Sequence, residues 1–159
     1  MGDTPQFQII GNLRIYGTDG SIRETHNVIC SGGLSMLRDY LFAATPSLAP
    51  QQPLYVAYGS GTQPVGRFMS IVPGETFRAN IVQRDQSVGT PSVVYHWFLL
   101  DSDNSSQTVG SYGLIGGSAT QSANTGTLFA IANEPVPYSK SPTTAYAGDW
   151  SITVSGVIS

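Results

Sequence analysis

The side chains best able to ligate a metal or transfer a proton are two histidines, His26 and His96, and a single cysteine, Cys30. An intrachain disulfide or a cysteine-based zinc cluster needs more than one cysteine, so the sequence excludes both. His26 lies in a polar stretch, and His96 lies directly before Trp97 in an apolar run. Because no pattern around either histidine nominates a serine nucleophile or further ligands, we expect both to have structural roles.

Acidic residues alternate with serine from Asp101 to Ser105, a spacing with which carboxylates can converge on a calcium ion. The calcium-loop template, however, requires glycine at the position of Ser106 and a bidentate glutamate at the position of Tyr112. The segment therefore does not fit the template. Asp and Asn side chains also hydrogen-bond to their own backbone in turns, and we expect a turn of this kind.

Two glycine-rich segments also fail as functional motifs. Gly59-Ser60-Gly61 lacks the lysine of a phosphate-binding loop. Gly110-Ser111-Tyr112-Gly113 lacks the single residue that separates the serine of a nucleophile elbow from each glycine. We interpret both segments as turns at strand ends. Without a catalytic constellation, the sequence predicts a protein that is not an enzyme and that uses no metal and no cofactor.

The composition narrows the class of protein further. Only 11% of the 159 residues are charged, and 7 Lys+Arg against 10 Asp+Glu give a net charge of −3. The cations are dispersed, whereas nucleic-acid-binding proteins gather them into a patch or stripe, so we expect no nucleic-acid partner. No apolar run approaches the ~18 residues of a membrane span, and the first residues lack the basic and apolar regions of a signal peptide. We therefore expect no membrane partner and folding in a cytosol.

The spacing of apolar residues predicts a mainly β chain. In the segment 75–84, apolar Phe77, Ala79 and Ile81 alternate with polar neighbours, which is the period of a half-buried strand. Segment 92–100 is almost continuously apolar, which predicts a central strand buried on both faces. Further strands are predicted at 7–16, 21–30, 54–62, 109–117, 125–136 and 149–157, with a hairpin turn at 17–20 and a long loop at 137–149.

One segment has helical spacing instead. Leu34, Leu37 and Leu41 recur on one helical face, Ser31 can cap the first turn, and Pro46 blocks continuation. This pattern predicts one short α-helix over about 32–44. Short strands joined mostly by turns then predict a single antiparallel β-sandwich, or a jelly-roll-like variant of it, over 1–159, with a short extended segment at about 1–6.

Aromatic residues raise the possibility of a sugar-binding surface, because sugars stack on aromatic rings. Trp97 lies in an apolar run and Trp150 on the apolar face of its strand, so we assign both to the core. Tyr138 and Tyr146 fall in the expected long loop and are the aromatic residues expected to be exposed. Their exposure would suit a protein interface as well as a sugar site.

The order of several short blocks resembles a group of small virion proteins of tailed bacteriophages. The resemblance covers about residues 26–156, and a Gly-Gly-Leu helix start at 32–34 comes first. The blocks that follow are LYVAYGSGT, PGETFRANI with Glu75 and Arg78 at the family's Glu-x-x-Arg, YGLIGG with Gly113-Leu114, TGTLFAIANEPVPYSK with Lys140, and DWSITVSG with Trp150-Ser151-Ile152. One departure is Ser111-Tyr112, which stands where the family usually has an acidic residue before its Gly-Leu pair.

The resemblance implies a non-enzymatic structural protein of the virion, assembled in the host cytoplasm. The expected role is that of a capsid decoration (cement) protein, which binds the outer capsid surface and bridges capsomers. Its expected partners are the major capsid protein of the same virion and further copies of itself, with a trimer as the expected oligomer. A structural protein of the tail, baseplate or fibre is the alternative, and a carbohydrate-binding β-sandwich is the second alternative.

Extended segments are the expected contacts of such a protein with its neighbours. We expect them in the N-terminal stretch 2–8, the proline-rich connector 45–53 and the loop 133–148. Exposed aromatic residues often dominate the binding energy of an interface. The interface residues predicted on this basis are Phe7, Pro46, Pro50, Pro53, Tyr138, Lys140 and Tyr146.

Overall fold

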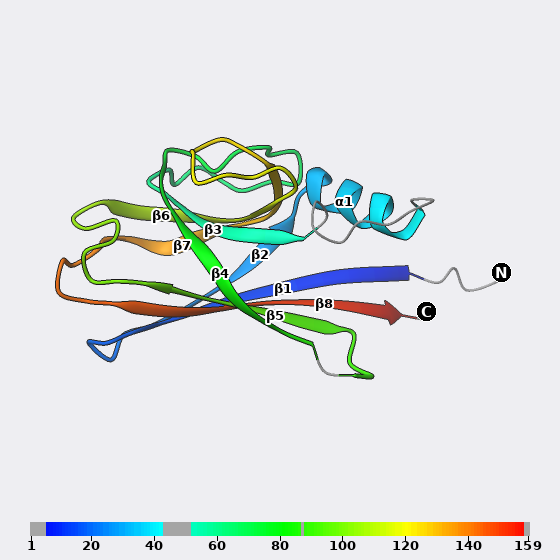
Figure 1. The fold of residues 1–159 in the computed structure, drawn as a ribbon, viewed down its shortest axis with the longest axis horizontal. Helices are drawn as coiled ribbons and strands as arrows, with labels where there is room; N and C mark the ends of the chain where they lie inside the picture. The colour runs from blue at the N-terminus through cyan, green and yellow to red at the C-terminus, as the bar shows by residue number, and fades with distance from the viewer. Residues whose placement is uncertain (1–5, 43–51, 87, 158–159) are drawn as a thin grey trace.

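The computed structural model describes residues 6–42, 52–86 and 88–157 of the chain. These residues form eight strands and one helix (Figure 1). The strands are β1 (Gln6–Gly17), β2 (Ile22–Ile29), β3 (Pro53–Gly59), β4 (Glu75–Asp85), β5 (Ser92–Leu99), β6 (Thr108–Gly116), β7 (Thr127–Ser139) and β8 (Tyr146–Val157), and the helix α1 (Ser31–Phe42) follows β2.

The eight strands close into one barrel in the order β1-β2-β7-β6-β3-β4-β5-β8, and every neighbouring pair is antiparallel. Strand β8 completes the closure, because it pairs with β1 from Tyr146 to Val157 and with β5 from Tyr146 to Thr153. The predicted β-sandwich or jelly-roll-like fold is therefore wrong. Sandwich and barrel strands show the same inward–outward alternation, and only the long-range pairing of β1 with β8 distinguishes them.

Aromatic side chains fill the interior of the barrel. Trp97 and Trp150 lie with ring centroids 6.4 Å apart, and the indole of Trp97 donates a hydrogen bond of 2.8 Å to the hydroxyl of Tyr58. Tyr58 in turn makes an edge-to-face contact with Tyr112 at 5.4 Å. The assignment of both tryptophans to the core is confirmed. Because bulky side chains occupy the interior, the wall of this barrel is a rigid support.

Strand β6 is buried on both faces, whereas β5 is not. In β6 every residue from Val109 to Gly116 is buried, because the segments 60–74 and 117–126 cover the outer side of β3 and β6. In β5 only alternate residues are buried, and Phe98 is 60% exposed on the outer wall. The continuous apolar run in 92–100 thus predicted the wrong strand, since one of its apolar faces meets solvent.

A buried ion pair holds the segment 117–126 against the barrel. Arg78 and Glu75 are paired with side chains that are almost completely buried. The Arg78 guanidinium also donates to the carbonyl oxygens of Thr120 and Thr125, at 2.7 and 3.0 Å, and Glu75 accepts a hydrogen bond of 3.0 Å from the backbone N–H of Asn124. In this chain the Glu-x-x-Arg motif therefore has a clear structural task, which is to anchor a covering loop.

Helix α1 begins at Ser31 and packs against β7 at one end of the barrel. Its approach is close: a Cβ atom on Gly33 would collide with the backbone of Phe129. Met36 is buried and Leu37 half-buried against the core, whereas Leu34 is exposed. Only part of the expected leucine stripe thus faces the barrel. No helix in the described part of the chain is long and apolar enough to cross a membrane.

Candidate functional site

Tyr138 and Tyr146 are not exposed loop residues, so that expectation is wrong. They lie in β7 and β8, and their rings pack 6.1 Å apart. Tyr146 is only 5% exposed, and the Arg23 guanidinium stacks 3.5 Å above the centre of the Tyr138 ring. Burial raises the pKa of Tyr138 to about 12. The expected long loop is short, because β7 and β8 extend to Ser139 and Tyr146.

Lys140 is buried as well, with 1% of the residue exposed, so it is not an exposed anchor. Its ammonium group donates hydrogen bonds to the carbonyl oxygens of Asp101 at 2.7 Å and Ser141 at 3.1 Å. Removal from water lowers the pKa of Lys140. A lysine in this setting joins two loops at one end of the barrel, and neither its burial nor its partners could be read from local sequence.

The other predicted interface residues lie at the opposite end of the barrel or outside the described residues. Pro53 is buried at the start of β3, where it pairs with Gly116. Phe7 lies in β1 opposite Gly156, and its side chain is outside the described part of the structure. Pro46 and Pro50 fall outside the described residues altogether.

Both histidines have polar partners on the outer wall, although His96 comes from the run expected to be buried. The ring of His96 lies between two carboxylates, 2.7 Å from Asp149 and 3.0 Å from Asp85. His26 is hydrogen-bonded to Asn12. Within residues 6–42, 52–86 and 88–157, no group of three or more His, Cys, Asp or Glu side chains is placed to hold a metal ion. These contacts are those of structural histidines on a polar surface.

A row of apolar residues crosses four neighbouring strands on this outer wall. The register places Tyr16 opposite both Ile22 and Ala147, and Ala147 opposite Phe98. Ile22 is 66% exposed, and Phe98 and Leu100 are each 60% exposed. The row borders a shallow apolar hollow that Ala145 and Leu100 also line. We call Tyr16, Ile22, Phe98, Leu100, Ala145 and Ala147 the apolar band.

A charged row lies beside the apolar band, one step further along the same strands. Arg14 forms an ion pair of 3.0 Å with Glu24 across β1 and β2, and Asp149 on β8 contacts His96 on β5. Residues on one face of a strand recur every second position, so each member of this row lies directly next to a member of the apolar band. The band thus has a sharp polar border.

Acidic side chains border the band at the loop end of the barrel. Asp19 follows Thr18 in the β1–β2 turn, and Asp101 and Asp103 follow Leu100. The amide and hydroxyl of Ser21 both donate to the Asp19 carboxylate, which lowers the pKa of Asp19 and keeps it ionised. Asp103 accepts a hydrogen bond of 2.9 Å from the Leu100 amide, and Asp101 accepts one of 2.8 Å from the Ser102 amide. The segment 101–105 is thus a turn whose carboxylates bond to nearby backbone, although neither bond joins residues two apart as in an Asx turn.

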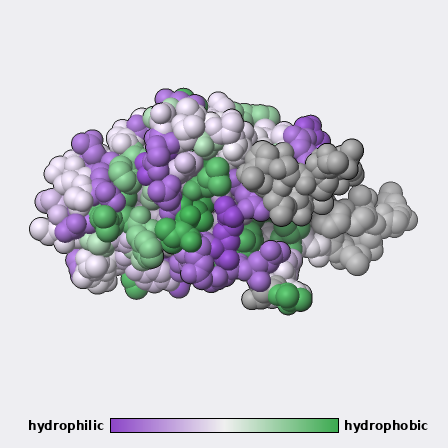
Figure 2. Space-filling view, in the orientation of Figure 1, coloured by the Kyte–Doolittle hydropathy of each residue, from purple (hydrophilic) through white to green (hydrophobic). Residues whose placement is uncertain are grey.

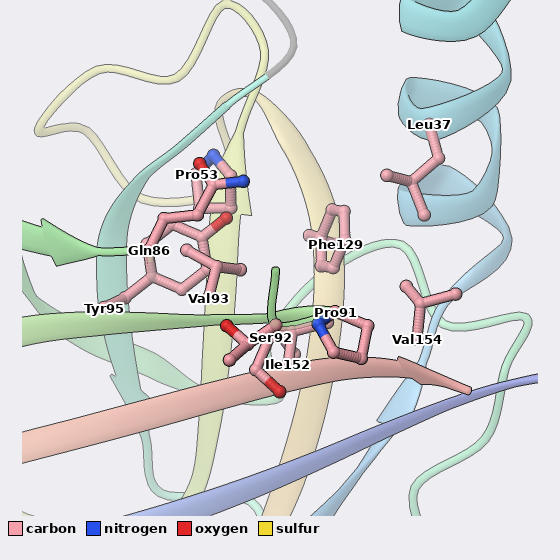
Figure 3. A pocket seen from close by; sticks show the side chains of 11 residues that line it. Leu37, Pro53, Gln86, Pro91, Ser92, Val93, Tyr95, Phe129, Ile152 and Val154 are labelled. Carbon is pink, nitrogen blue, oxygen red and sulfur yellow. The ribbon is translucent and has the colours of Figure 1, made fainter. Parts of the chain in front are cut away.

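A second hollow lies at the opposite end of the barrel, between α1 and the ends of several strands. Figure 3 shows Leu37 on the helix facing Phe129 from β7 and Val154 from β8 across this space. Its lining is mainly apolar, with polar groups from Gln86, Thr90 and Ser92 at one side. The described part of the molecule therefore has a hollow at each end, and a continuous row of exposed apolar residues borders the one beside the apolar band.

The exposed face of the molecule is mixed rather than uniformly polar. Figure 2 shows apolar patches interrupted by hydrophilic residues on the face in view. The apolar band does not follow from the sequence prediction, because that prediction places the whole run containing Phe98 in the core. A local signal was available: once Trp97 and Leu99 point inward, Phe98 between them must point outward.

Fold and surface together define the chain as a closed, eight-stranded antiparallel β-barrel with a filled interior and an apolar band on its outer wall. No family model, no curated protein and no solved structure matches the chain. The resemblance to bacteriophage virion proteins therefore remains a prediction from sequence.

Proposed function

We propose that this protein is a non-enzymatic structural component of a bacteriophage virion, namely a capsid decoration protein that binds the outer capsid surface and bridges capsomers. The observation that carries the proposal is the apolar band, exposed on a wall that a packed core holds rigid. Contiguous exposed apolar surface marks protein-binding sites, and rigid aromatic residues such as Phe98 are effective anchors within them.

The proposed action is mechanical. Each copy would bury an interface of about 1,600 Å² in total against shell subunits. Binding to the assembled lattice, and not to free subunits, stabilises the assembled state by mass action. A filled barrel suits this role because its outer surface keeps one shape while it bears a load.

A carbohydrate-binding role is the second candidate, and one observation favours it. Asn12, Arg14, Tyr16, Glu24 and Asp149 line a shallow hollow on the outer wall. An aromatic ring beside carboxylate and guanidinium groups can stack on a sugar and hydrogen-bond to its hydroxyls. Binding of glycans on an array, lost in a Tyr16→Ser variant, would favour this role over that of a shell protein.

The number of copies per particle tests the proposal directly. Virions from the source of this sequence are purified, heads and tails are separated, and the protein is quantified by mass spectrometry. Hundreds of copies that fractionate with the heads are expected for a decoration protein. A few copies that fractionate with the tails would assign the protein to the tail, baseplate or fibre instead, and absence from both fractions would refute a virion role.

A further inference from the structure

We propose that the apolar band docks onto a different protein whose contact surface is apolar at its centre and basic at its edge. This inference rests on the proposed function, because it specifies the partner chemistry of the same surface. It depends on three features of the outer wall: the continuity of the band, the sign of the charges around it, and the consequence of that sign for self-association.

The continuity of the band follows from strand register. Ile22, Tyr16, Ala147 and Phe98 are successive cross-strand neighbours on β2, β1, β8 and β5. Leu100 and Ala145 extend the row beyond the ends of β5 and β8. A continuous row of this kind can be buried by one partner surface without any rearrangement of the barrel.

The accessible charge around the band is mainly acidic. Asp19, Asp101 and Asp103 lie at one side and Asp149 at the other. The described cations in the same region are already engaged, and none offers a free positive charge. Arg14 pairs with Glu24, Arg23 contacts Glu134 and the Tyr138 ring, and Lys140 is buried against carbonyl oxygens.

This charge pattern argues against a second copy of the chain as the occupant. A symmetric pair formed through the band would bring the acidic borders of two copies together, and like charges across an interface oppose binding. A partner with lysine or arginine around an apolar centre would instead match both the band and its border. Electrostatic attraction of this kind speeds association and weakens as salt is added.

The test uses the full chain and two synthetic amphipathic helical peptides that share one leucine face. One peptide carries lysine along both edges of that face, and the matched peptide carries glutamate at the same positions. Amide chemical shifts of the isotope-labelled protein are followed as each peptide is added. We expect the lysine peptide to shift the signals of Tyr16, Phe98 and Ala147, with an affinity that falls as salt is raised, and the glutamate peptide to shift none.

Two substitutions of the same type provide the matched comparison. Phe98→Ser removes an anchor of the band and should weaken binding of the lysine peptide at least about fivefold, the effect expected of a residue that contributes to an interface. Phe68→Ser removes a comparably exposed ring, 79% accessible, in the segment that covers β3 and β6, and should leave the affinity unchanged. The amide spectrum of each variant reports whether it is folded.

Several results would overturn this inference, and a further one would overturn the proposed function alone. Shifts at the other end of the barrel, or equal binding of the two peptides, would show that the band does not select a basic partner. Sedimentation that reveals self-association, abolished by Phe98→Ser, would assign the band to a second copy. If the lysine peptide binds as expected but the protein is absent from virions, the docking surface stands and the virion role is refuted. Failure of the inference can therefore be distinguished from failure of the proposed function.

Discussion

At the scale of single residues, buried polar side chains carry structural tasks that their positions in the sequence do not reveal. Glu75 and Arg78 form an ion pair beneath the segment 117–126 and hydrogen-bond to its backbone. Taking two charges out of water is costly, and the cost is offset only when the partners and their hydrogen bonds are complete. Loss of one partner therefore leaves the other charge buried and unpaired.

We expect Arg78→Met to lower the free energy of unfolding by about 3–5 kcal/mol, the range observed when one member of a buried ion pair is removed. Arg14→Met is the matched control, because Arg14 pairs with Glu24 on the exposed wall, and it should change stability by less than about 1 kcal/mol. Urea denaturation of both variants measures the difference. Equal effects would mean that the Arg78 pair does not hold the covering segment.

The predicted interface residues illustrate what residue identity alone can and cannot indicate. Tyr138, Lys140 and Tyr146 follow a proline-containing polar stretch, which is typical of an exposed loop. In the structure Lys140 and Tyr146 are buried and Tyr138 is half-buried. The reason is that β7 and β8 continue through this region and that loop carbonyl oxygens solvate the lysine. The partners of these side chains come from distant parts of the chain, so no local pattern could identify them.

At the scale of elements, strand positions were predictable, whereas strand neighbours were not. Alternation of apolar and polar residues, with a period of two, correctly predicted strand segments such as 75–84. Leucine spacing predicted the helix close to its observed bounds of Ser31–Phe42. Barrel closure, by contrast, depends on β8 lying between β1 and β5. The apolar band could not be predicted for the same reason, because its members on β1, β8 and β5 become neighbours only when β8 pairs with the other two strands.

Close packing between elements leads to a specific expectation at Gly148. A Cβ atom at this position in β8 would overlap the ring of Trp97, which is itself fully buried and cannot move aside. We expect Gly148→Ala to lower the free energy of unfolding by about 1–3 kcal/mol, the usual cost of an overpacked core. Thermal and urea denaturation would measure this loss.

Gly66 provides the control for that substitution. A Cβ atom at Gly66 would meet no other atom within 4 Å. Gly66→Ala should therefore leave stability unchanged or raise it slightly, because alanine restricts the unfolded chain. A comparable loss of stability in both variants would contradict the packing argument, since a general intolerance of alanine would then explain the result at 148.

At the scale of the whole molecule, the described core contains several protonated phenols and one thiol whose pKa values burial raises. Burial raises the pKa values of Tyr58, Tyr95 and Tyr112, and that of Cys30 to about 11. Each group has a higher pKa in the folded than in the unfolded chain. The stability that this difference supplies is therefore present below the unfolded pKa and is lost as the pH rises through the folded pKa.

We expect the barrel to unfold cooperatively in alkali, with tyrosine ionisation, read as absorbance near 295 nm, coinciding largely with loss of secondary structure. Cys30→Ala isolates the thiol: between pH 8 and pH 10.5 the variant should lose less stability than the native chain, by on the order of 2 kcal/mol. Ionisation of most phenols in a protein that keeps its fold would contradict the expectation.

The position of β8 between β1 and β5 also has a consequence for biosynthesis. The ribosome synthesises β8 after the two strands that must hold it, so the seam of the barrel cannot close until β8 has also been released. Until then β1 and β5 present unpaired backbone edges to the crowded polysome, and such edges are where nascent chains stick to one another. Slowing translation just before codon 146 should lengthen this vulnerable interval and increase the insoluble fraction.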